Sequence, residues 1–483
     1  MNIPRILLTA GASGSGKTLL TCGMLQVLKN RGLKVMSFKC GPDYIDPMFH
    51  AQVIGTPSRN LDTFFTGKEG TRELLAKNGA GCDVAVLEGV MGYYDGLGGI
   101  STDASAYDVA QVTDTPAVLI VNCKGMSVSI LPYVKGFLEF RGDSHIRGVI
   151  LNQMTPMLYP RVKAMIEDEL HIEVYGYVPK LTDCVLESRH LGLVLPNEVA
   201  ELQEKLHKLA DVLEDTLDVD KLLELAKQSG KLPETRNNSG SGAKTTNAES
   251  VAAVGFGTLN EDLDFSTCSG NKSDVLGKSI RIAVARDEAF CFIYEDNLQL
   301  LRDMGAELVE FSPIHDEALP EHVQGLLLYG GYPELYAREL SENVPMRDSI
   351  HNAIELGLPC IAECGGFMYL MDSLESMEYE KFPMAGVFCG DAFRTEKLSR
   401  FGYVTLTDGT AFGEQVGDIP AHEFHYFDTT DNGDTFTTKK PLSKRSWNCI
   451  HSTPTLFAGF PHIHFYGNKK VAAAFLKACW KFG

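Results

Sequence analysis

The sequence predicts an α/β protein of two domains, the first of them built on a parallel sheet. In both halves of the chain, short apolar runs alternate with segments of helical periodicity, which is the pattern of strand–helix–strand units. The length of 483 residues exceeds what a single core supports. A stretch rich in Ser, Gly and Asn divides the halves, so we expect domains at residues 1–228 and 278–483, joined by a flexible linker at 229–277.

Composition narrows the classes of function. Hydrophobic residues make up 44% of the chain and charged residues 22%, as in a folded protein. The formal net charge of −19 argues against sequence-independent binding to nucleic acid or to a membrane surface. The 12 cysteines include no C-x-x-C pair, so we expect neither a disulfide framework nor a zinc site. The first strand follows almost directly on Met1 and no apolar run reaches about 18 residues, which predicts a cytoplasmic protein.

The first strand, expected at 3–10, leads into residues 11–18, which spell G-A-S-G-S-G-K-T. This matches the phosphate-loop pattern G-x-x-x-x-G-K-[ST], and the apolar periodicity that follows predicts the required helix. In such a loop, backbone N–H groups and the helix N-terminus hold phosphate oxygens, the lysine reaches the β- and γ-phosphates, and the hydroxyl of Thr18 can ligate Mg²⁺. We therefore expect ATP to be held by Gly11, Ser13, Gly14, Ser15, Gly16, Lys17 and Thr18.

Further strands of this sheet are expected at 33–38, 84–87, 117–121, 148–151 and 174–178. Ligands gather at the carboxyl ends of parallel strands, so the polar residues that follow each strand are candidates for the site.

Two of these strand ends carry carboxylates. The loop 39–47 holds Asp43, Tyr44 and Asp46 between prolines, which predicts contacts to Mg²⁺ or substrate; a rigid turn with capping aspartates is the alternative. Glu88 directly follows the strand expected at 84–87, where phosphate-loop proteins place the carboxylate on the Mg²⁺ side.

Weaker candidates lie at other strand ends and loops of this half. Arg59 and Asp62 could contact substrate, although a helix cap explains Asp62 about as well. Asn152 follows the strand at 148–151 and is either a turn residue or a contact to the nucleotide. Arg189 and His190 lie together in a loop and could meet substrate carboxylates or solvent.

The second half begins with strands expected at 280–285, 307–311 and 325–329, the last of which ends in a glycine turn. The stretch 357–370 then reads as a turn, a short strand, Cys364, two glycines and a helix. This is the order of a nucleophile elbow with cysteine in place of serine, in which the helix N-terminus favours the thiolate. Cys364 is therefore the expected nucleophile.

A cysteine nucleophile needs a base, and two histidine pairs are candidates. His422 and His425 form one pair, and His462 and His464 the other. The second pair follows an apolar stretch, and residues i and i+2 of a strand share a face. One histidine of that pair can act as the base and the other as its orienting partner.

Taken together, the motifs at 41–47, 58–62, 189–193, 330–336, 362–366 and 422–425 resemble those of the cobyrinic acid a,c-diamide synthase family, whose members also act on hydrogenobyrinic acid and nickel-sirohydrochlorin. The resemblance covers both domains. It implies a first domain of the dethiobiotin-synthetase type of P-loop NTPase, which uses ATP and Mg²⁺ to phosphorylate the a and c carboxylates of the corrin precursor. It implies a second domain of the class I glutamine amidotransferase type, which supplies ammonia from glutamine.

The resemblance also implies roles for individual residues. It favours His462 as the base, but familiar class I amidotransferases carry an acid two residues later, where this chain has His464, so both histidines stay candidates. Backbone N–H groups of Gly331 and Gly365 are the expected oxyanion hole. The expected Mg²⁺ ligands are Thr18, Asp43 and Glu88, and the expected substrate contacts are Tyr44, Asp46, Arg59, Asp62, Arg189 and His190.

Three expectations complete the prediction. The partners are small molecules, namely ATP, L-glutamine and a tetrapyrrole polycarboxylate, and the two sites should face each other so that water is kept out. The oligomeric state stays open, with a homodimer as one alternative.

The rival class is a nucleotide-switched partition ATPase, but such proteins carry a second lysine early in the phosphate loop, where this chain has Ser13, and they lack the cysteine elbow.

Overall fold

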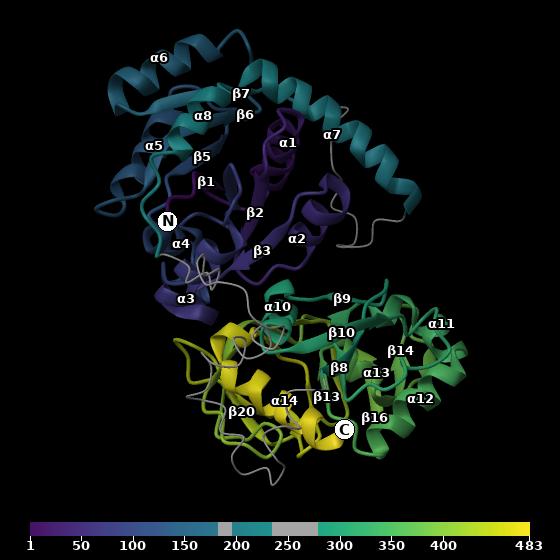
Figure 1. The fold of residues 1–483 in the computed structure, drawn as a ribbon. Coiled ribbons are helices and arrows are strands. Elements are labelled where there is room, and N and C mark those ends of the chain that lie inside the picture. Colours follow the sequence, from purple (N-terminus) through teal and green to yellow (C-terminus); the bar gives the residue numbers. More distant parts are fainter. Residues whose placement is uncertain (182–195, 234–278) are drawn as a thin grey trace, which may run out of the picture. The chain divides into compact units, whose positions relative to one another are not determined.

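The computed structural model describes residues 1–181, 196–233 and 279–483. The chain divides into two compact units, Met1–Arg236 and Asn237–Gly483, each of which is described by itself (Figure 1). Most of the expected linker at 229–277 lies outside the described residues. Its first residues pack on the first unit, because Ser229 donates to the carbonyl of Ile3 at 2.9 Å and the buried Arg5 donates to the carbonyl of Gly230 at 2.7 Å.

The first unit is built on a seven-stranded, all-parallel sheet with strand order β3-β2-β4-β1-β5-β6-β7. Its strands are β1 Arg5–Ala10, β2 Val35–Cys40, β3 Ser58–Leu61, β4 Val84–Glu88, β5 Ala117–Asn122, β6 Ile146–Asn152 and β7 Glu173–Val178. The six strands expected from apolar runs are confirmed. The sequence did not signal β3, because that strand has four residues and only Leu61 is apolar.

Helices surround this sheet (Figure 1, purple to teal). They are α1 Lys17–Asn30, α2 Ile45–Phe49, α3 Thr63–Asn78, α4 Ala106–Thr113, α5 Ile130–Glu139, α6 Tyr159–Leu170, α7 Pro196–Thr216 and α8 Val219–Ala226, with the π-helix η1 His50–Ile54 and the 3-10 helix η2 Leu97–Gly99. Apolar side chains of α1, α7 and α8 share one core with the sheet. The close packing of α1 on α7 depends on Gly23, where a Cβ atom would lie 2.5 Å from Leu213 Cδ1.

The second unit has a central sheet of six strands in the order β10-β8-β11-β13-β23-β22. Five strands are parallel and the edge strand β22 is antiparallel, and an apolar core covers each face. The strands are β8 Ile280–Ala285, β10 Ala306–Phe311, β11 Gly325–Leu328, β13 Cys360–Glu363, β22 His451–Ser452 and β23 Leu456–Gly459. The helices are α10 Glu295–Asp303, α11 Ala337–Glu342, α12 Val344–Glu355, α13 Gly365–Tyr369 and α14 Lys469–Phe482, with turns η4 Pro333–Leu335 and η5 Phe465–Gly467.

Three smaller sheets complete the second unit, and two of them come mostly from the segment between α13 and β22. They are β15-β14-β16-β19, β21-β20-β17-β18-β24 and the pair β12-β9. Their strands are β9 Phe290–Phe292, β12 Gly330–Gly331, β14 Met371–Glu375, β15 Lys381–Pro383, β16 Phe388–Arg394, β17 Arg400–Thr407, β18 Ile419–His425, β19 Phe427–Thr429, β20 Phe436–Lys439, β21 Ser446–Cys449 and β24 His462–Ile463. The antiparallel pairing of β18 with β24 sets His422 opposite His462 and so joins the two histidine motifs.

In the part of the chain that the structure describes, no helix is both long and apolar enough to cross a membrane. The α/β fold class predicted for both halves is confirmed.

Candidate active sites

The phosphate loop lies between β1 and α1, and two glycines turn it. Gly14 and Gly16 have φ angles of 74° and 91°, in the left-handed region that favours glycine. A Cβ atom on Gly16 would lie 2.4 Å from Nδ2 of Asn152, which is buried and donates a hydrogen bond to the carbonyl of Ser15 at 2.9 Å. Asn152 therefore supports the loop from behind, in addition to any contact with a nucleotide.

Lys17 begins α1 and is almost completely buried. Its Nζ donates to the carbonyl of Ala12 at 3.0 Å and to the carbonyl of Met91, which follows β4. Burial, together with the nearby charge of Lys39, lowers the pKa of Lys17 to about 8. The two hydrogen-bond acceptors of this ammonium are neutral carbonyls, so the oxygens of a bound phosphate could replace them.

A group of oxygen atoms lies directly beside the loop. The hydroxyl of Thr18 donates to Glu88 Oε1 at 2.8 Å and lies 3.4 Å from Asp46 Oδ2. A hydroxyl with two carboxylates is a donor set that suits Mg²⁺, whose other ligands are commonly waters and phosphates. Protein atoms alone do not complete such a site, because among the described residues no group of three or more His, Cys, Asp or Glu is arranged to hold a metal.

Lys39 and His50 complete this cluster, and sequence reasoning assigned neither of them a role. Lys39 sits opposite Glu88 in the pairing of β2 with β4, and its Nζ lies 2.8 Å from Glu88 Oε1 and also pairs with Asp46. His50 Nε2 lies 3.4 Å from Glu88 Oε2, and Ser37 on β2 contacts its Nδ1 at 2.9 Å. The available signal was a lysine, the only charged residue, inside the mostly apolar strand V-M-S-F-K-C.

The buried charges of this cluster shift one another's pKa values. Burial alone would lower the pKa of Lys39, but the carboxylates of Glu88, Asp46 and Asp43 hold it well above its usual value. Burial would raise the pKa of Glu88, yet Lys39 and His50 hold it below its usual range. Burial and the neighbouring carboxylates raise the pKa of Asp46. The cluster therefore keeps Glu88 as an anion beside Thr18.

The structure ranks the predicted carboxylates differently from the sequence. Asp43, expected as a metal ligand, accepts the backbone N–H of Ile45 at 2.9 Å, and its other oxygen lies 3.6 Å from Lys39. Asp46, expected to contact substrate, is the carboxylate near Thr18. One oxygen of Asp43 therefore caps backbone N–H groups of the turn, as the alternative interpretation of this loop expected. Asp46, together with Glu88, is the stronger candidate as a Mg²⁺ ligand.

The remaining predicted substrate contacts are spread more widely. Asp62 accepts the N–H groups of Phe64 at 2.8 Å and Phe65 at 3.3 Å, so it is the N-cap of α3. Arg59 donates to the carbonyl of Ser58 at 2.8 Å, and Tyr44 is buried just before α2. Arg189 and His190 lie outside the described residues.

In the second unit, Cys364 occupies a sharp turn between β13 and α13. Its φ of 49° and ψ of −105° are strained for a residue with a side chain, as expected of a nucleophile elbow. A Cβ atom on Gly366 would lie 2.0 Å from the carbonyl oxygen of Leu328, so only glycine fits there. Gly365 and Gly331, the predicted oxyanion hole, lie against each other, with the Gly331 N atom 3.1 Å from the place of a Cβ on Gly365.

His462 is the histidine that the structure brings to Cys364. Its Nδ1 lies 3.4 Å from Glu363 Oε2, and both side chains are almost fully buried. Burial alone would lower the pKa of His462, but its interactions with Cys364 and Glu363 raise it to about 10. A Cβ atom on Gly330 would lie 2.5 Å from Cε1 of this ring, so the glycine leaves room for it.

His464 occupies a different environment. Its ring lies 5.0 Å from that of Tyr294 and 5.9 Å from that of Tyr466, and burial lowers its pKa to about 3. The strand β24 ends at Ile463, whose carbonyl accepts a hydrogen bond from Asn297 at 2.9 Å, so the i, i+2 alternation expected of a strand does not extend to His464. Of the two candidates, the geometry therefore favours His462 as the base.

The other histidine pair has separate surroundings. His422 lies opposite His462, and burial together with His462 lowers its pKa to about 3. His425 stacks on Phe460 with ring centres 4.0 Å apart, and its Nδ1 donates to the carbonyl of Phe427 at 2.6 Å. Neither arrangement provides the contact to Cys364 that His462 makes.

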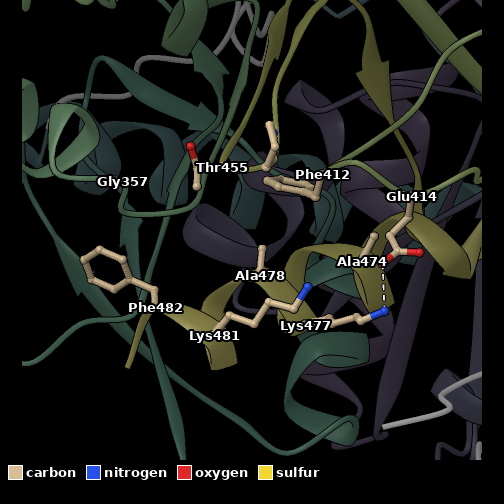
Figure 2. Close-up of a pocket in the computed structure, with 10 residues that line it drawn as sticks. Gly357, Phe412, Glu414, Thr455, Ala474, Lys477, Ala478, Lys481 and Phe482 are labelled. Carbon is tan, nitrogen blue, oxygen red and sulfur yellow. Dashed lines mark hydrogen bonds and ion pairs between the residues drawn. The ribbon is translucent and has the colours of Figure 1, made fainter. Parts of the chain in front are cut away.

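A cavity of about 280 Å³ lies along α14. Lys477 Nζ lies 2.7 Å from Glu414 Oε1 at this cavity, and Figure 2 shows this pair with Lys481 beside it. None of the residues assigned to the phosphate loop, its oxygen cluster or the cysteine elbow lines this cavity. It is therefore separate from both candidate sites.

These two sites define a class of protein. A phosphate loop with an adjacent oxygen cluster can activate a carboxylate by phosphorylation, and a cysteine–histidine elbow can release ammonia from glutamine. The combination of these two sites in one chain is typical of an ATP-using, glutamine-dependent ligase.

Comparison with known proteins identifies the family. Residues 6–193 match the CobQ/CobB/MinD/ParA nucleotide binding domain, and residues 281–470 match the CobB/CobQ-like glutamine amidotransferase domain. The cobyrinate a,c-diamide synthase of Caldanaerobacter subterraneus is 36% identical over 485 residues, which is 99% of each chain. That of Listeria innocua is 39% identical over 97% of each chain, and that of Thermoplasma volcanium is 34% identical over all of this chain and 98% of its own. The chain belongs to the cobyrinate a,c-diamide synthase family.

The predicted family and the predicted enzyme class, a glutamine-dependent carbon–nitrogen ligase, are thus confirmed. The first unit is a nucleotide-binding domain, as the phosphate loop predicted. The partition ATPase is set aside, because the second unit is a glutamine amidotransferase domain.

Proposed function

We propose that the protein catalyses the ATP-dependent amidation of the a and c carboxylates of cobyrinic acid, with glutamine as nitrogen donor, in cobalamin biosynthesis. The observation that carries this proposal is the nearly full-length similarity to proteins named cobyrinate a,c-diamide synthase. In this proposal residues 1–228 form the amidoligase domain and 278–483 the glutaminase domain, connected by 229–277. We further propose a cytoplasmic location.

Activation of the carboxylate takes place at the phosphate loop. A carboxylate oxygen of the substrate attacks the γ-phosphorus of ATP, the bond to the β,γ-bridging oxygen breaks, and ADP leaves behind an acyl phosphate. The N–H groups of residues 11–18 and the ammonium of Lys17 stabilise the charge that develops on the phosphates. Thr18, Glu88 and Asp46 would hold Mg²⁺, which supplies neutralisation of that charge when bound.

Ammonia is generated at the elbow. The thiolate of Cys364 attacks the side-chain amide carbon of glutamine, and the N–H groups of Gly331 and Gly365 stabilise the resulting oxyanion. His462 gives its proton to the departing ammonia, which leaves a thioester that water hydrolyses to glutamate. Ammonia then attacks the acyl phosphate carbon, and inorganic phosphate leaves to give the amide.

Binding of the macrocycle requires further side chains of the first unit. We propose that Tyr44, just before α2, and Arg59, within β3, contact the macrocycle, with Arg189 and His190 as further candidates. The cap of α3 already uses one oxygen of Asp62, so a substrate contact there would involve the other. The facing of the two sites and a homodimer stay predictions.

The test is an incubation of the purified enzyme with ATP, Mg²⁺ and glutamine, in which cobyrinic acid, hydrogenobyrinic acid and nickel-sirohydrochlorin are offered separately and products are followed by mass spectrometry. Two successive amidations of cobyrinic acid are expected. Amidation of only one of the other macrocycles would reassign the substrate. Consumption of ATP and glutamine with no amidated macrocycle would refute the substrate assignment.

A further inference from the structure

The glutaminase site lacks an acid at the position two residues after its base, where this chain has His464. An imidazole base needs a partner on the nitrogen that faces away from the nucleophile, because that partner selects the tautomer and holds the ring in orientation. His464 cannot serve, since it lies among the rings of Tyr294 and Tyr466. The orienting group must therefore come from elsewhere in the fold.

Among the described residues, the carboxylate of Glu363, which immediately precedes the nucleophile, contacts the base. Its Oε2 lies 3.4 Å from Nδ1 of His462, and the two side chains are 1% and 3% exposed. With Nδ1 directed at this carboxylate, Nε2 is the ring nitrogen left for Cys364. Two consecutive residues of the chain thus meet the same imidazole from two directions.

The elbow explains how consecutive residues can do this. Glu363 ends β13 in regular pairing with β23, whereas the positive φ of Cys364 turns the chain sharply one residue later. The turn directs the Cys364 side chain out of the strand's alternation, so it and Glu363 both reach His462. The same strain that exposes the nucleophile therefore also places an acid behind the base.

We propose that Glu363 is the positioning residue of the glutaminase site, holding His462 with Nδ1 protonated and Nε2 toward Cys364, in place of the acid that this chain lacks after its base. The inference rests on the proposed glutaminase role of Cys364. A buried carboxylate is costly unless it is paired, and His462 is the charged partner found for this one in the described part of the chain. Removing the carboxylate should loosen the ring and weaken the imidazolium–thiolate pair.

The titratable groups around His462 and Glu363 determine in which direction Glu363→Gln should change the reactivity of Cys364. His462 is faced by Glu363 at the end of β13, by Cys364 in the turn that follows it, and by His422 from β18, with Glu423 and His425 further along β18. The phenol of Tyr329, just after β11, is near Glu363. Of these, Glu363 is the carboxylate in direct contact with the ring. Glu363→Gln should therefore weaken the imidazolium–thiolate pair and slow the reaction of the Cys364 thiol with an alkylating reagent.

The primary experiment measures the rate at which iodoacetamide alkylates Cys364 as a function of pH, read at this site by peptide mass spectrometry. Glu363→Gln should slow alkylation of Cys364 at neutral pH and lower the glutaminase kcat by about 10²- to 10⁴-fold, with KM for glutamine little changed. Glu363→Asp, which retains the charge, should recover part of both. Ammonia-dependent synthesis should persist in both variants, which shows that the chain is folded.

The matched control is Glu423→Gln, which removes another fully buried carboxylate of the same unit that pairs with Arg400 at 3.8 Å. It should leave the alkylation profile of Cys364 in place. A Glu363→Gln variant with the wild-type profile and kcat would overturn the proposal.

A second measurement uses the unaltered carboxylate and so does not depend on the folding of any Glu363 variant. In ¹⁵N-histidine-labelled Cys364→Ser protein, with the His462 signal assigned by its loss in a His462→Gln version, Nδ1 should carry a proton at neutral pH. An unprotonated Nδ1 would contradict the proposal. Neither alkylation nor the spectrum requires turnover of a macrocycle, so failure of the substrate assignment would leave both readouts intact.

Discussion

The two sites of this protein contain the same pair of groups in opposite roles. In the first unit His50 Nε2 lies 3.4 Å from Glu88 Oε2, and in the second His462 Nδ1 lies 3.4 Å from Glu363 Oε2, with all four side chains buried. In the first, the carboxylate faces the reacting centre and the imidazole lies behind it. In the second, the imidazole faces the nucleophile and the carboxylate lies behind.

Lys39, the third charged group of the first site, explains why the two carboxylates differ. Lys39 adds a full positive charge beside Glu88 and holds its pKa below the usual range, whereas burial raises the pKa of Glu363. The first site therefore keeps a permanent anion suited to a cation. The second keeps a protonated imidazole, with a pKa of about 10, suited to a thiolate.

The largest effect expected in either site is that of Cys364→Ser. Loss of the thiolate nucleophile should lower glutamine-dependent synthesis by about 10⁴-fold or more, because no other group of the elbow can form the thioester. Synthesis with added ammonium salt should remain close to that of the wild type. If added ammonia does not restore synthesis in this variant, the two sites do not carry out independent half-reactions, and the assignment of separate roles to them is wrong.

Lys17→Ala should produce the complementary loss. Removal of the ammonium that we expect at the phosphates should lower synthesis from glutamine and from ammonia alike by about 10³-fold. Glutamine hydrolysis, measured as glutamate release, serves as the internal control for folding of the second unit. Substantial synthesis by this variant would contradict the role of the phosphate loop.

Lys39→Met should test whether the lysine explains the contrast between the two glutamates. Leaving the buried carboxylates without their cation should cost about 3 kcal/mol of unfolding free energy at pH 8. The loss should shrink as the pH falls toward 5, because the carboxylates of the variant then become protonated at little cost. In the wild type the low pKa of Glu88 stabilises the fold above its unfolded-state pKa, and that contribution disappears only as the pH falls toward the folded value.

Hydrogen-exchange protection of the β4 amides measures this stability, since it reports on the first unit alone. The exposed Lys34 provides the matched control, as Lys34→Met should change protection little at either pH. A pH-independent loss in Lys39→Met would argue that packing, rather than charge, is the role of this lysine.

The smallest expected effect concerns Asp62. As the N-cap of α3 its replacement in Asp62→Ala should cost about 1 kcal/mol of local stability, seen as faster hydrogen exchange in α3. Ser105→Ala, which removes the N-cap of α4, should have a similar effect there. A rise in KM for the macrocycle in Asp62→Ala but not in Ser105→Ala would show that Asp62 also binds substrate.

Sequence reasoning succeeded where a site is contiguous in the chain. The phosphate loop at 11–18 and the elbow around Cys364 each carry their own glycines and flanking elements, so pattern alone predicts their shape. It succeeded less well where the partners are distant. Lys39 and His50 were assigned no role, and Asp43 was favoured as a metal ligand although Asp46 lies closer to Thr18.

The sequence by itself determined the α/β class, the phosphate loop, the cysteine elbow and the family, because these depend on local periodicity and on short motifs. Only the tertiary structure decided which carboxylates and imidazoles meet. Pairing of β2 with β4 sets Lys39 beside Glu88, and pairing of β18 with β24 sets His462 beside His422 and close to the elbow. Such pairs depend on the register between strands far apart in the chain, and that register follows from burial of the whole sheet rather than from any one segment.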